Sequence, residues 1–322
     1  MQALVRAPGP RAGGGEPEDA RPALPPLVLG EIADPQPAPH QALVRVRATS
    51  LNRGECRRLP ELPPASTTGW DLAGEVVREA ADGSGPKEGS RVVGLVASGA
   101  WAQLAAVDAD WLAELPAGVS FAEAATLPVA GLTALKALDL CGSLLARRVL
   151  VTGASGGVGS FALQLAHLVG AHVIALSRDP GQAGALQELG AAEVIYDLAG
   201  CTVEPDAIIE GVGGRTLGAA LARVAPWGTV VSFASSDAAE VAFPARSLFA
   251  RAPGATLHGL FIFATLARCG GAGSELARLL ALLESGRLRC QIAEELPWEQ
   301  ADAGIEALMS RRVIGKIVLR ID

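Results

Sequence analysis

Val149-Leu-Val-Thr-Gly-Ala-Ser-Gly-Gly-Val-Gly159 is the stretch of sequence that decides the fold. An apolar strand runs into closely spaced glycines and then into a helix. The glycines let the backbone pass close to a pyrophosphate, and the N–H groups at the N-terminus of the helix favour its negative charge. In the G-x-G-x-x-G pattern the first position is Ala154. We expect this turn to bind a dinucleotide through Ser155, Gly156, Gly157, Val158 and Gly159.

The residues after the turn complete a βαβ unit. Phe161, Leu165 and Leu168 have helical spacing, Gly170 is placed to end the helix, and His172 to Leu176 forms a second apolar strand. A strand, helix and strand of this length are what the dinucleotide fingerprint requires. The alternative is a glycine turn without a ligand, and this context favours the dinucleotide site over it.

The end of the second strand indicates which cofactor is bound. An acidic residue there hydrogen-bonds a ribose 2′-hydroxyl, whereas this chain has Ser177 and Arg178, a hydroxyl and a cation that fit a 2′-phosphate. We therefore expect NADPH. Two alternatives stay open: Asp179 serves NADH if the loop register differs by one residue, and Arg178 is a solvated loop charge.

The composition is that of an ordinary globular chain. Its 322 residues suit two domains, and 50% of them are hydrophobic. The net charge of −7 argues against a nucleic-acid or anionic-membrane surface. No apolar run reaches the about 18 residues of a membrane span, and the N-terminus lacks the pattern of a secretory signal. Five widely spaced cysteines suit a reducing compartment, so we expect a cytoplasmic protein.

Patterning divides the chain into a β-rich part and an alternating part. Short strand-like segments and turns dominate up to residue 122, with a Pro- and Gly-rich stretch from Ala7 to Pro39 that we expect to be a mobile loop. Ser120 and Glu123 have the spacing of a capping box that opens a helix. Strands and helices then alternate, which is typical of a parallel sheet. The six expected strands are 149–151, 173–176, 194–196, 207–210, 229–233 and 256–261.

The C-terminal segment contains two amphipathic helices and a closing strand. Leu276, Leu279, Leu280 and Leu283 share one helix face that ends at Gly286; a second helix covers 301–310, and Lys316 to Arg320 reads as a strand. We expect this tail to rejoin the β-rich part. The apolar strand 256–263 at the expected sheet edge invites pairing, so we expect a homodimer joined there.

Several segments, in order, resemble the medium-chain dehydrogenase/reductase superfamily. The resemblance implies an α/β fold, with a Rossmann doubly wound parallel sheet at 123–261 and a GroES-like β-rich catalytic domain formed by 1–122 and 262–322. Besides the glycine turn, the segments are Ser50-Leu-Asn-Arg53, Gly69-Trp-Asp-Leu-Ala-Gly-Glu-Val76, Glu88-Gly-Ser-Arg-Val92, Ala124-Ala-Thr-Leu-Pro128, Gly131-Leu-Thr133 and Gly315-Lys-Ile-Val-Leu319.

The same resemblance tests for a catalytic zinc. Asn52 stands where zinc-dependent members have a cysteine ligand, and Trp70 stands where they have a histidine. Neither side chain is a good zinc ligand, and the sequence has no C-x-x-C pair. We therefore expect no metal.

The chain thus looks like the zinc-free branch, which contains quinone oxidoreductases of the zeta-crystallin type and enoyl reductases. This resemblance implies hydride transfer from NADPH to a quinone or to the C=C bond of an α,β-unsaturated carbonyl. Two alternatives stay open. One is a dedicated polyketide-pathway enoyl reductase or reductive cyclase, and the other is a catalytically silent NADPH-binding protein.

Site residues follow from the resemblance and from strand ends. Asn52 is the expected catalytic donor to a substrate carbonyl or the nicotinamide ribose, and Thr133 the expected partner of the carboxamide. Some relatives have a tyrosine shortly after the Asn52 position, but this chain does not, which leaves water, Cys56 or an arginine as proton donor. Further expected cofactor residues are Tyr196, Val212, Gly213, Phe233, Ser235 and, near the 2′-phosphate, Lys316. Each of these also has an ordinary structural interpretation.

Overall fold

The structure, a computed structural model, describes residues 1–7, 24–311 and 313–321. The chain forms two compact units. The β-rich unit comprises Met1–Val129, Cys269–Glu284 and Ile292–Asp322, and the parallel-sheet unit comprises Ala130–Arg268 and Ser285–Gln291. The sequence pattern placed the boundaries between the two domains after residues 122 and 261. In the structure the units change after Val129 and after Arg268. The first boundary lies within the π-helical turn η3 (Leu127–Gly131), and the second comes after α7 (Ile262–Arg268), because α7 packs against α3 (Leu132–Asp139).

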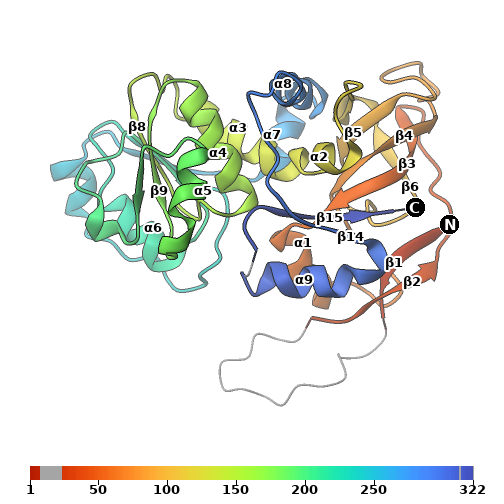
Figure 1. The fold of residues 1–322 in the computed structure, drawn as a ribbon, viewed down its shortest axis with the longest axis horizontal. Coiled ribbons are helices and arrows are strands. Elements are labelled where there is room, and N and C mark those ends of the chain that lie inside the picture. Colours follow the sequence, from red (N-terminus) through yellow and green to blue (C-terminus); the bar gives the residue numbers. More distant parts are fainter. Residues whose placement is uncertain (8–23, 312, 322) are drawn as a thin grey trace, which may run out of the picture. The chain divides into compact units, whose positions relative to one another are not determined.

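The β-rich unit is built on a mixed sheet with the order β14-β15-β3-β4-β5-β7, in which β6 also pairs with β3, and on a separate β1-β2 pair (Figure 1). Its strands are β1 (Gln2–Arg6), β2 (Leu27–Glu31), β3 (Gln41–Ser50), β4 (Asp71–Arg78), β5 (Arg91–Leu95), β6 (Leu104–Asp108), β7 (Leu112–Glu114), β14 (Ile292–Pro297) and β15 (Lys316–Arg320). Its helices are α1 (Arg53–Arg58), η1 (Leu59–Glu61), η2 (Ala109–Trp111), α2 (Phe121–Ala125), α8 (Gly273–Glu284), η7 (Trp298–Gln300) and α9 (Ala301–Met309).

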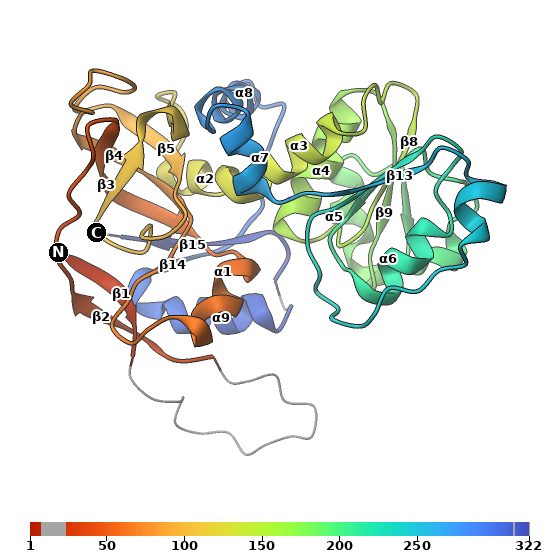
Figure 2. The same ribbon diagram turned by 180° about the vertical axis from the view of Figure 1, so that it is seen from behind.

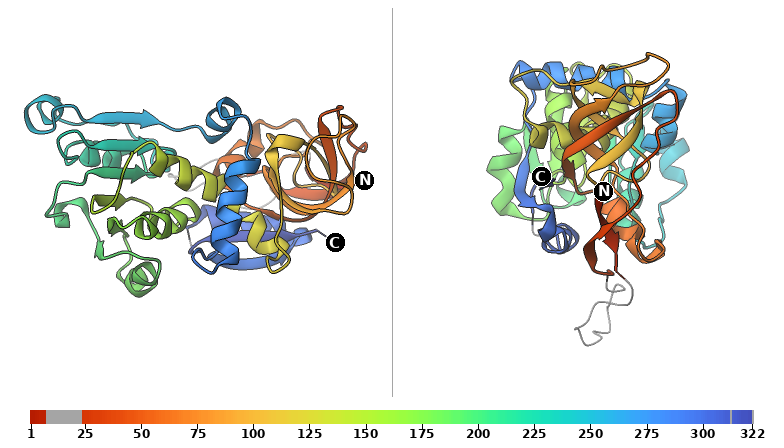
Figure 3. Two further views of the ribbon diagram at one scale, coloured as in Figure 1. Left: turned by 90° about the horizontal axis from the view of Figure 1, so that it is seen from above. Right: turned by 90° about the vertical axis from the view of Figure 1, so that its right-hand side faces the viewer.

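Strand β3 organises this unit. Val44, Val46 and Ala48 alternate along it and are buried in the core, as the period of a strand requires. Strand β15 pairs antiparallel with the end of β3, with Val318 opposite Ser50. The first and last described strands, β1 and β15, therefore belong to the same unit (Figure 3).

The second unit is a sheet of six parallel strands with the order β10-β9-β8-β11-β12-β13, flanked by helices (Figures 1 and 2). The chain starts in the middle of the sheet, winds to one edge and then to the other, which is the doubly wound arrangement. Its strands are β8 (Arg148–Val151), β9 (His172–Leu176), β10 (Glu193–Ile195), β11 (Ala207–Glu210), β12 (Thr229–Ser232) and β13 (Thr256–Gly259). Besides α3 and α7, its helices are α4 (Gly157–Leu168), η4 (Pro180–Gln182), α5 (Ala183–Glu188), η5 (Leu198–Gly200), α6 (Gly214–Leu221) and η6 (Ser247–Arg251).

The expected loop from Ala7 to Pro39 was wrong for part of its length. Residues 27–31 form β2, which pairs antiparallel with β1, and the Cβ of any side chain added at Gly30 would lie 2.8 Å from Val5 Cγ2. The prolines on either side of the short apolar segment 27–31 favoured the prediction of a loop. Its partner strand β1 lies just before the stretch, about 20 residues away. Residues 8–23 lie outside the described part of the chain.

The expected strand through Phe263 was also too long. β13 ends at Gly259, which pairs with Ser232, the last residue of its partner strand β12. The Leu260 N–H still donates to the Ser232 carbonyl at 2.8 Å, and the chain then turns and begins α7, whose Ile262 and Leu266 are buried on one face. Only the first half of the apolar run is therefore an edge strand.

Candidate cofactor and catalytic site

The glycine turn has the geometry that its sequence predicts. Gly153 has φ = +59°, and Gly156 is the N-cap of α4. A Cβ at Gly159 would lie 2.4 Å from the carbonyl oxygen of Gly153, so only glycine lets the helix approach the turn so closely. No described side chain caps the N-terminus of α4. Its first N–H groups, from Gly157 to Gly159, therefore form a cradle that fits an anionic pyrophosphate.

This turn lies at the topological switch of the sheet. It follows β8, whose neighbours in the sheet are β9 on one side and β11 on the other. The order of the strands reverses between β8 and β11, and doubly wound sheets bind dinucleotides outside the carboxyl ends of their strands at such a point. The fold therefore places the glycine turn where a dinucleotide is expected.

The end of β9 carries one open cation and two engaged side chains. Arg178 is exposed, and its guanidinium has no hydrogen-bond or ion-pair partner among the described residues. The Asp179 carboxylate accepts the Gly181 N–H at 2.9 Å and caps η4, while the Ser177 hydroxyl donates to Gln182 Oε1 at 3.0 Å. Asp179 is thus held in a local cap, and Arg178 is the side chain left to meet a ligand.

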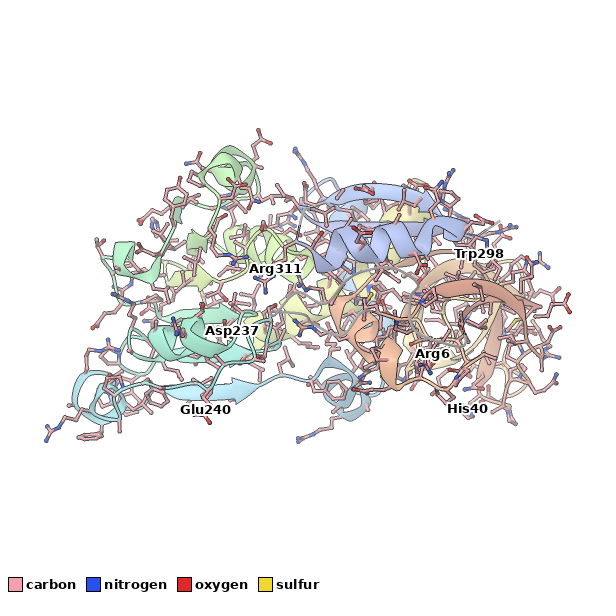
Figure 4. All side chains as sticks on the ribbon, turned by 90° about the horizontal axis from the view of Figure 1, so that it is seen from below. Arg6, His40, Asp237, Glu240, Trp298 and Arg311 are labelled. Atoms are coloured by element: carbon pink, nitrogen blue, oxygen red, sulfur yellow. The ribbon has the colours of Figure 1, made fainter. Side chains whose placement is uncertain are left out.

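Two other expected cofactor residues have their polar groups engaged. The Val212 N–H donates to Glu210 Oε1 at 2.8 Å, and its carbonyl oxygen accepts the N–H groups of Ser236 and Asp237 at 2.7 Å each. Gly213 forms a bridge with Asp237, which is labelled in Figure 4, and its N–H also donates to Glu210. The backbone polar groups of Val212 and the Gly213 N–H are therefore engaged in hydrogen bonds within the protein. These residues can contribute to a ligand site through the shape of the surface that they form.

The remaining expected residues of this unit lie near the ends of their strands. The Phe233 ring lies over Gly211, where an added Cβ would be 2.4 Å from Cζ, and the Ser235 hydroxyl donates to the Asp237 carbonyl. Tyr196 directly follows β10 and is 46% exposed, which leaves its ring open to a ligand. Thr133 is buried in α3, and its hydroxyl has no hydrogen-bond partner within the described residues.

The β-rich unit contains a buried polar cluster around Asn52. Lys316 Nζ donates to Asn52 Oδ1 at 2.6 Å and to the Leu51 carbonyl at 2.9 Å, and it lies 3.4 Å from Asp71 Oδ2. Asn52 Nδ2 in turn donates to Asp71 Oδ2 at 2.8 Å, as does the Ser50 hydroxyl at 2.5 Å. The main-chain N–H of Val129 donates to the other oxygen of Asp71 at 2.9 Å.

This cluster changes the interpretation of two expected site residues. Both ends of the Asn52 amide are engaged inside the protein, so in this arrangement Asn52 does not present a donor to a substrate. The Lys316 ammonium is buried and bound to the cluster of the β-rich unit, so its partners are not those expected near a 2′-phosphate. The pairing of β15 with β3 produces this placement, because it sets Lys316 beside Leu51.

Glu55 completes the cluster. It is fully buried; its Oε1 accepts the Asn52 N–H at 2.7 Å and lies 3.2 Å from Asn52 Nδ2, while its Oε2 has no partner among the described residues. Burial and, next, the charge of Asp71 raise the pKa of Glu55 from 4.5 to about 8, against the lowering effect of Lys316. The raised pKa favours the protonated form of Glu55.

Sequence reasoning missed Glu55 and Glu210. Glu55 stands three residues after the N-cap Asn52, which is the spacing of a capping box and was a readable signal. Glu210 ends an apolar strand, and a charged residue there indicated a specific set of partners. No pattern connected Asn52 with Lys316, because 264 positions separate them.

Two features are absent from the described residues. No three His, Cys, Asp or Glu side chains gather in a way that could hold a metal ion. No helix of this part of the chain combines the length and the apolar character needed to cross a membrane.

The chain is similar to known families and solved structures over most of its length. Residues 38–117 match the family described as alcohol dehydrogenase GroES-like domain, and residues 189–319 match the one described as zinc-binding dehydrogenase. Over its whole length the chain is similar in structure to a quinone oxidoreductase from Coxiella burnetii, with a TM-score of 0.81 and 26% identity, covering 100% of this chain and 99% of the other. The chain belongs to the medium-chain dehydrogenase/reductase superfamily.

Within this superfamily, the relatives place the chain in the branch of quinone oxidoreductases and enoyl reductases. It is 33% identical over 326 residues to a spectinabilin polyketide synthase protein of Streptomyces orinoci, covering 96% of this chain and 14% of that protein. It is 34% identical over 197 residues to a trans-enoyl reductase of Aspergillus terreus, covering 53% and 64%. The chain thus spans less than two thirds of the length of these curated relatives. The family is one of oxidoreductases that bind pyridine nucleotides, and the glycine turn fits such a cofactor.

Proposed function

We propose that the chain is an NADPH-dependent reductase that transfers a hydride to a quinone or to the C=C bond of an α,β-unsaturated carbonyl. The observation that carries this proposal is the uncapped glycine turn at the switch point, together with the exposed Arg178 at the end of the next strand. A fixed cation at that position can bind a 2′-phosphate through two parallel hydrogen bonds. An NADH enzyme needs an acidic acceptor there, and Asp179 is held in a cap.

The residues of the parallel-sheet unit would bind and orient the cofactor. The N–H groups at the start of α4 would hold the pyrophosphate, Arg178 the 2′-phosphate, and the open Thr133 hydroxyl the carboxamide. Bound NADPH supplies the hydride. Because each contact fixes a different part of one long molecule, the reactive end is held in one orientation, which is the main contribution that a protein makes to hydride transfer.

The buried cluster would act through position and charge. Lys316 polarises the Asn52 amide through its hydrogen bond to Oδ1. Asp71 and Glu55 accept hydrogen bonds from Nδ2 and so hold the amide in one orientation. We propose that this network holds the backbone at Leu51 and Asn52 rigid. In this scheme Asn52 is a positioning residue, and solvent delivers the proton that follows the hydride.

We also propose that the reaction uses no zinc, although one matching family is described as zinc-binding. Asn52 replaces a thiolate and Trp70 an imidazole at the positions where the superfamily binds the metal. The Trp70 ring packs closely on Gly54, since a Cβ added at Gly54 would lie 2.7 Å from Trp70 Cη2. The cation beside Asn52 and Asp71 is the Lys316 ammonium. Elemental analysis of the purified protein tests this, since one zinc per chain contradicts it.

A carrier-bound acceptor is the second candidate. The similarity to a polyketide synthase protein over 96% of this chain favours an enoyl thioester as substrate. Such a substrate has the same activated C=C bond, so the same cofactor geometry serves both candidates. They differ in what binds the remainder of the substrate.

Steady-state oxidation of NADPH tests the proposed activity. Purified protein is assayed with 9,10-phenanthrenequinone, with simple enones and with an enoyl thioester, each with NADPH and with NADH. We expect turnover with NADPH and at least one acceptor. Preference for the thioester favours the polyketide role, whereas tight binding of NADPH without turnover indicates a silent binding protein. Tighter binding of NADH contradicts the cofactor assignment.

We further propose a cytoplasmic homodimer joined through the edge strand β13. The strand lies at the end of the sheet order, and Leu257 on it is 53% exposed, which leaves an apolar edge able to pair with a second copy. All five cysteines lie in the described residues and are free thiols, which supports a reducing compartment. Light scattering tests the dimer, and cell fractionation tests the location.

A further inference from the structure

A buried carboxylate stands at the switch point of the parallel sheet, outside the set of residues that the cofactor motif includes. Glu210 is the last residue of β11, the strand next to β8, and it is fully buried. The glycine turn follows the end of β8, and Glu210 stands at the end of the neighbouring strand β11. Glu210 therefore lies next to the expected dinucleotide site.

Glu210 is bound by donors that directly follow β8 and β11. Its Oε1 accepts the Val212 N–H at 2.8 Å, the Gly213 N–H at 3.0 Å and the Thr152 hydroxyl at 3.1 Å, and its Oε2 lies 3.2 Å from the Gly213 nitrogen. Thr152 Oγ1 also accepts the Gly211 N–H at 3.0 Å. These bonds tie the turn at 211–213 to the end of β8.

Burying a carboxylate is costly unless its charge is compensated. Burial raises the pKa of Glu210, and the donors from Gly213, Val212 and Thr152 act in the opposite direction. All these donors are neutral, so the compensation comes from the concentrated N–H groups of the turn. Successive backbone N–H groups of this kind attract anions. The acceptor inside this turn is thus the chain's own carboxylate.

The two turns on either side of the switch differ in the acceptor that their N–H groups meet. Within the described residues neither α4 nor α6 has a side-chain cap, but in the turn before α6 the Val212 and Gly213 N–H groups already donate to the buried Glu210 carboxylate. A dinucleotide carries its negative charge on its phosphates, and its nicotinamide end carries none of it. Among the described side chains the turn before α4 thus has no acceptor of the protein's own at its N–H groups, whereas the turn before α6 already holds a carboxylate next to its N-cap.

We propose that Glu210 is a positioning residue for the cofactor, which directs the pyrophosphate to the turn before α4 and holds the wall at Val212 and Gly213 in one conformation. This inference rests on the proposed function, because it requires NADPH as the ligand. Glu210 touches no reacting atom in this scheme. It acts through the turn that it holds.

Ligand binding tests the inference. The variants are Glu210→Gln, which keeps the size of the side chain, and Thr152→Val, which removes the hydroxyl that joins Glu210 to β8. The exposed Glu188→Gln is the matched control. Dissociation constants are measured by calorimetry for NADPH and for adenosine 2′,5′-bisphosphate, which lacks both the pyrophosphate and the nicotinamide, and the fluorescence of bound NADPH reports on the nicotinamide environment.

We expect Glu210→Gln to weaken NADPH binding about tenfold and to change its fluorescence, while binding of adenosine 2′,5′-bisphosphate stays within about twofold of the wild type. Thr152→Val should act in the same direction and less strongly, and the control should have no effect. Unchanged NADPH binding in both variants overturns the inference, and so does an equal loss of both ligands, which indicates a merely structural role. Failure of the wild type to bind NADPH refutes the proposed function instead.

Discussion

Replacing Glu55 by glutamine should change how the stability of the β-rich unit depends on pH. In the unfolded chain this carboxyl ionises near pH 4.5, and in the folded protein near pH 8, because it is buried beside Asp71 and is only partly compensated by Lys316. Between these values the folded state holds a proton that the unfolded state has released. Wild-type stability contributed by Glu55 is therefore fully present below about pH 4.5 and is lost as the pH rises to about 8.

The magnitude follows from the width of this window. The window from pH 4.5 to about 8 corresponds to on the order of 5 kcal/mol, since each pH unit is worth about 1.4 kcal/mol. Glutamine has the same shape but no charge, so Glu55→Gln lacks this term. Its stability relative to the wild type should rise between pH 5 and pH 8 by on the order of 4 kcal/mol and then level off.

Urea unfolding followed by tryptophan fluorescence is a suitable assay. Of the five tryptophans, only Trp227 lies outside the β-rich unit, so the signal reports mainly on the unit that contains Glu55. Both proteins are unfolded at intervals from pH 5 to pH 9, and Glu61→Gln serves as a control because Glu61 is exposed. A constant difference between variant and wild type over this range refutes the reasoning, since it means that Glu55 ionises alike in both states.

Four further predictions concern the cofactor, the cluster and the assembly. Arg178→Ala should raise the Kd for NADPH about 10- to 100-fold and leave that for NADH nearly unchanged, and equal effects on both contradict a 2′-phosphate contact. Gly159→Ala should abolish NADPH binding in a fluorescence titration, because the added Cβ meets a backbone oxygen, whereas Gly184→Ala has open space in α5 and should bind normally. Lys316→Met should lower the free energy of unfolding by about 3–5 kcal/mol, because it leaves Asp71 buried without its cation, and an unchanged urea midpoint rejects this. Leu257→Arg should give a monomer by light scattering where the wild type gives a dimer, and a monomeric wild type at micromolar concentration refutes pairing through β13.

Local sequence signals located most of the fold. The glycine turn, the capping box at Ser120 and the closing strand at Lys316 are formed where the sequence predicts them. Each depends on neighbours within a few residues: a glycine that relieves a clash, a side chain that reaches a nearby N–H, or an alternation that suits a strand. The misplaced elements lacked such signals, because β2 depends on pairing with β1, and the end of β13 depends on the length of β12.

The site was only partly readable for the same reason. By itself, the sequence determined that a dinucleotide turn opens a helix and that Arg178 follows the next strand, because those relations are local. Only the tertiary structure decided that Lys316 binds Asn52, through the antiparallel register of β15 on β3. It also decided that Glu210 binds both the turn after its own strand and Thr152, because β11 and β8 are neighbours in the sheet. Buried charges find partners across strands that are distant in the chain, and strand register, which no single segment encodes, fixes those partners.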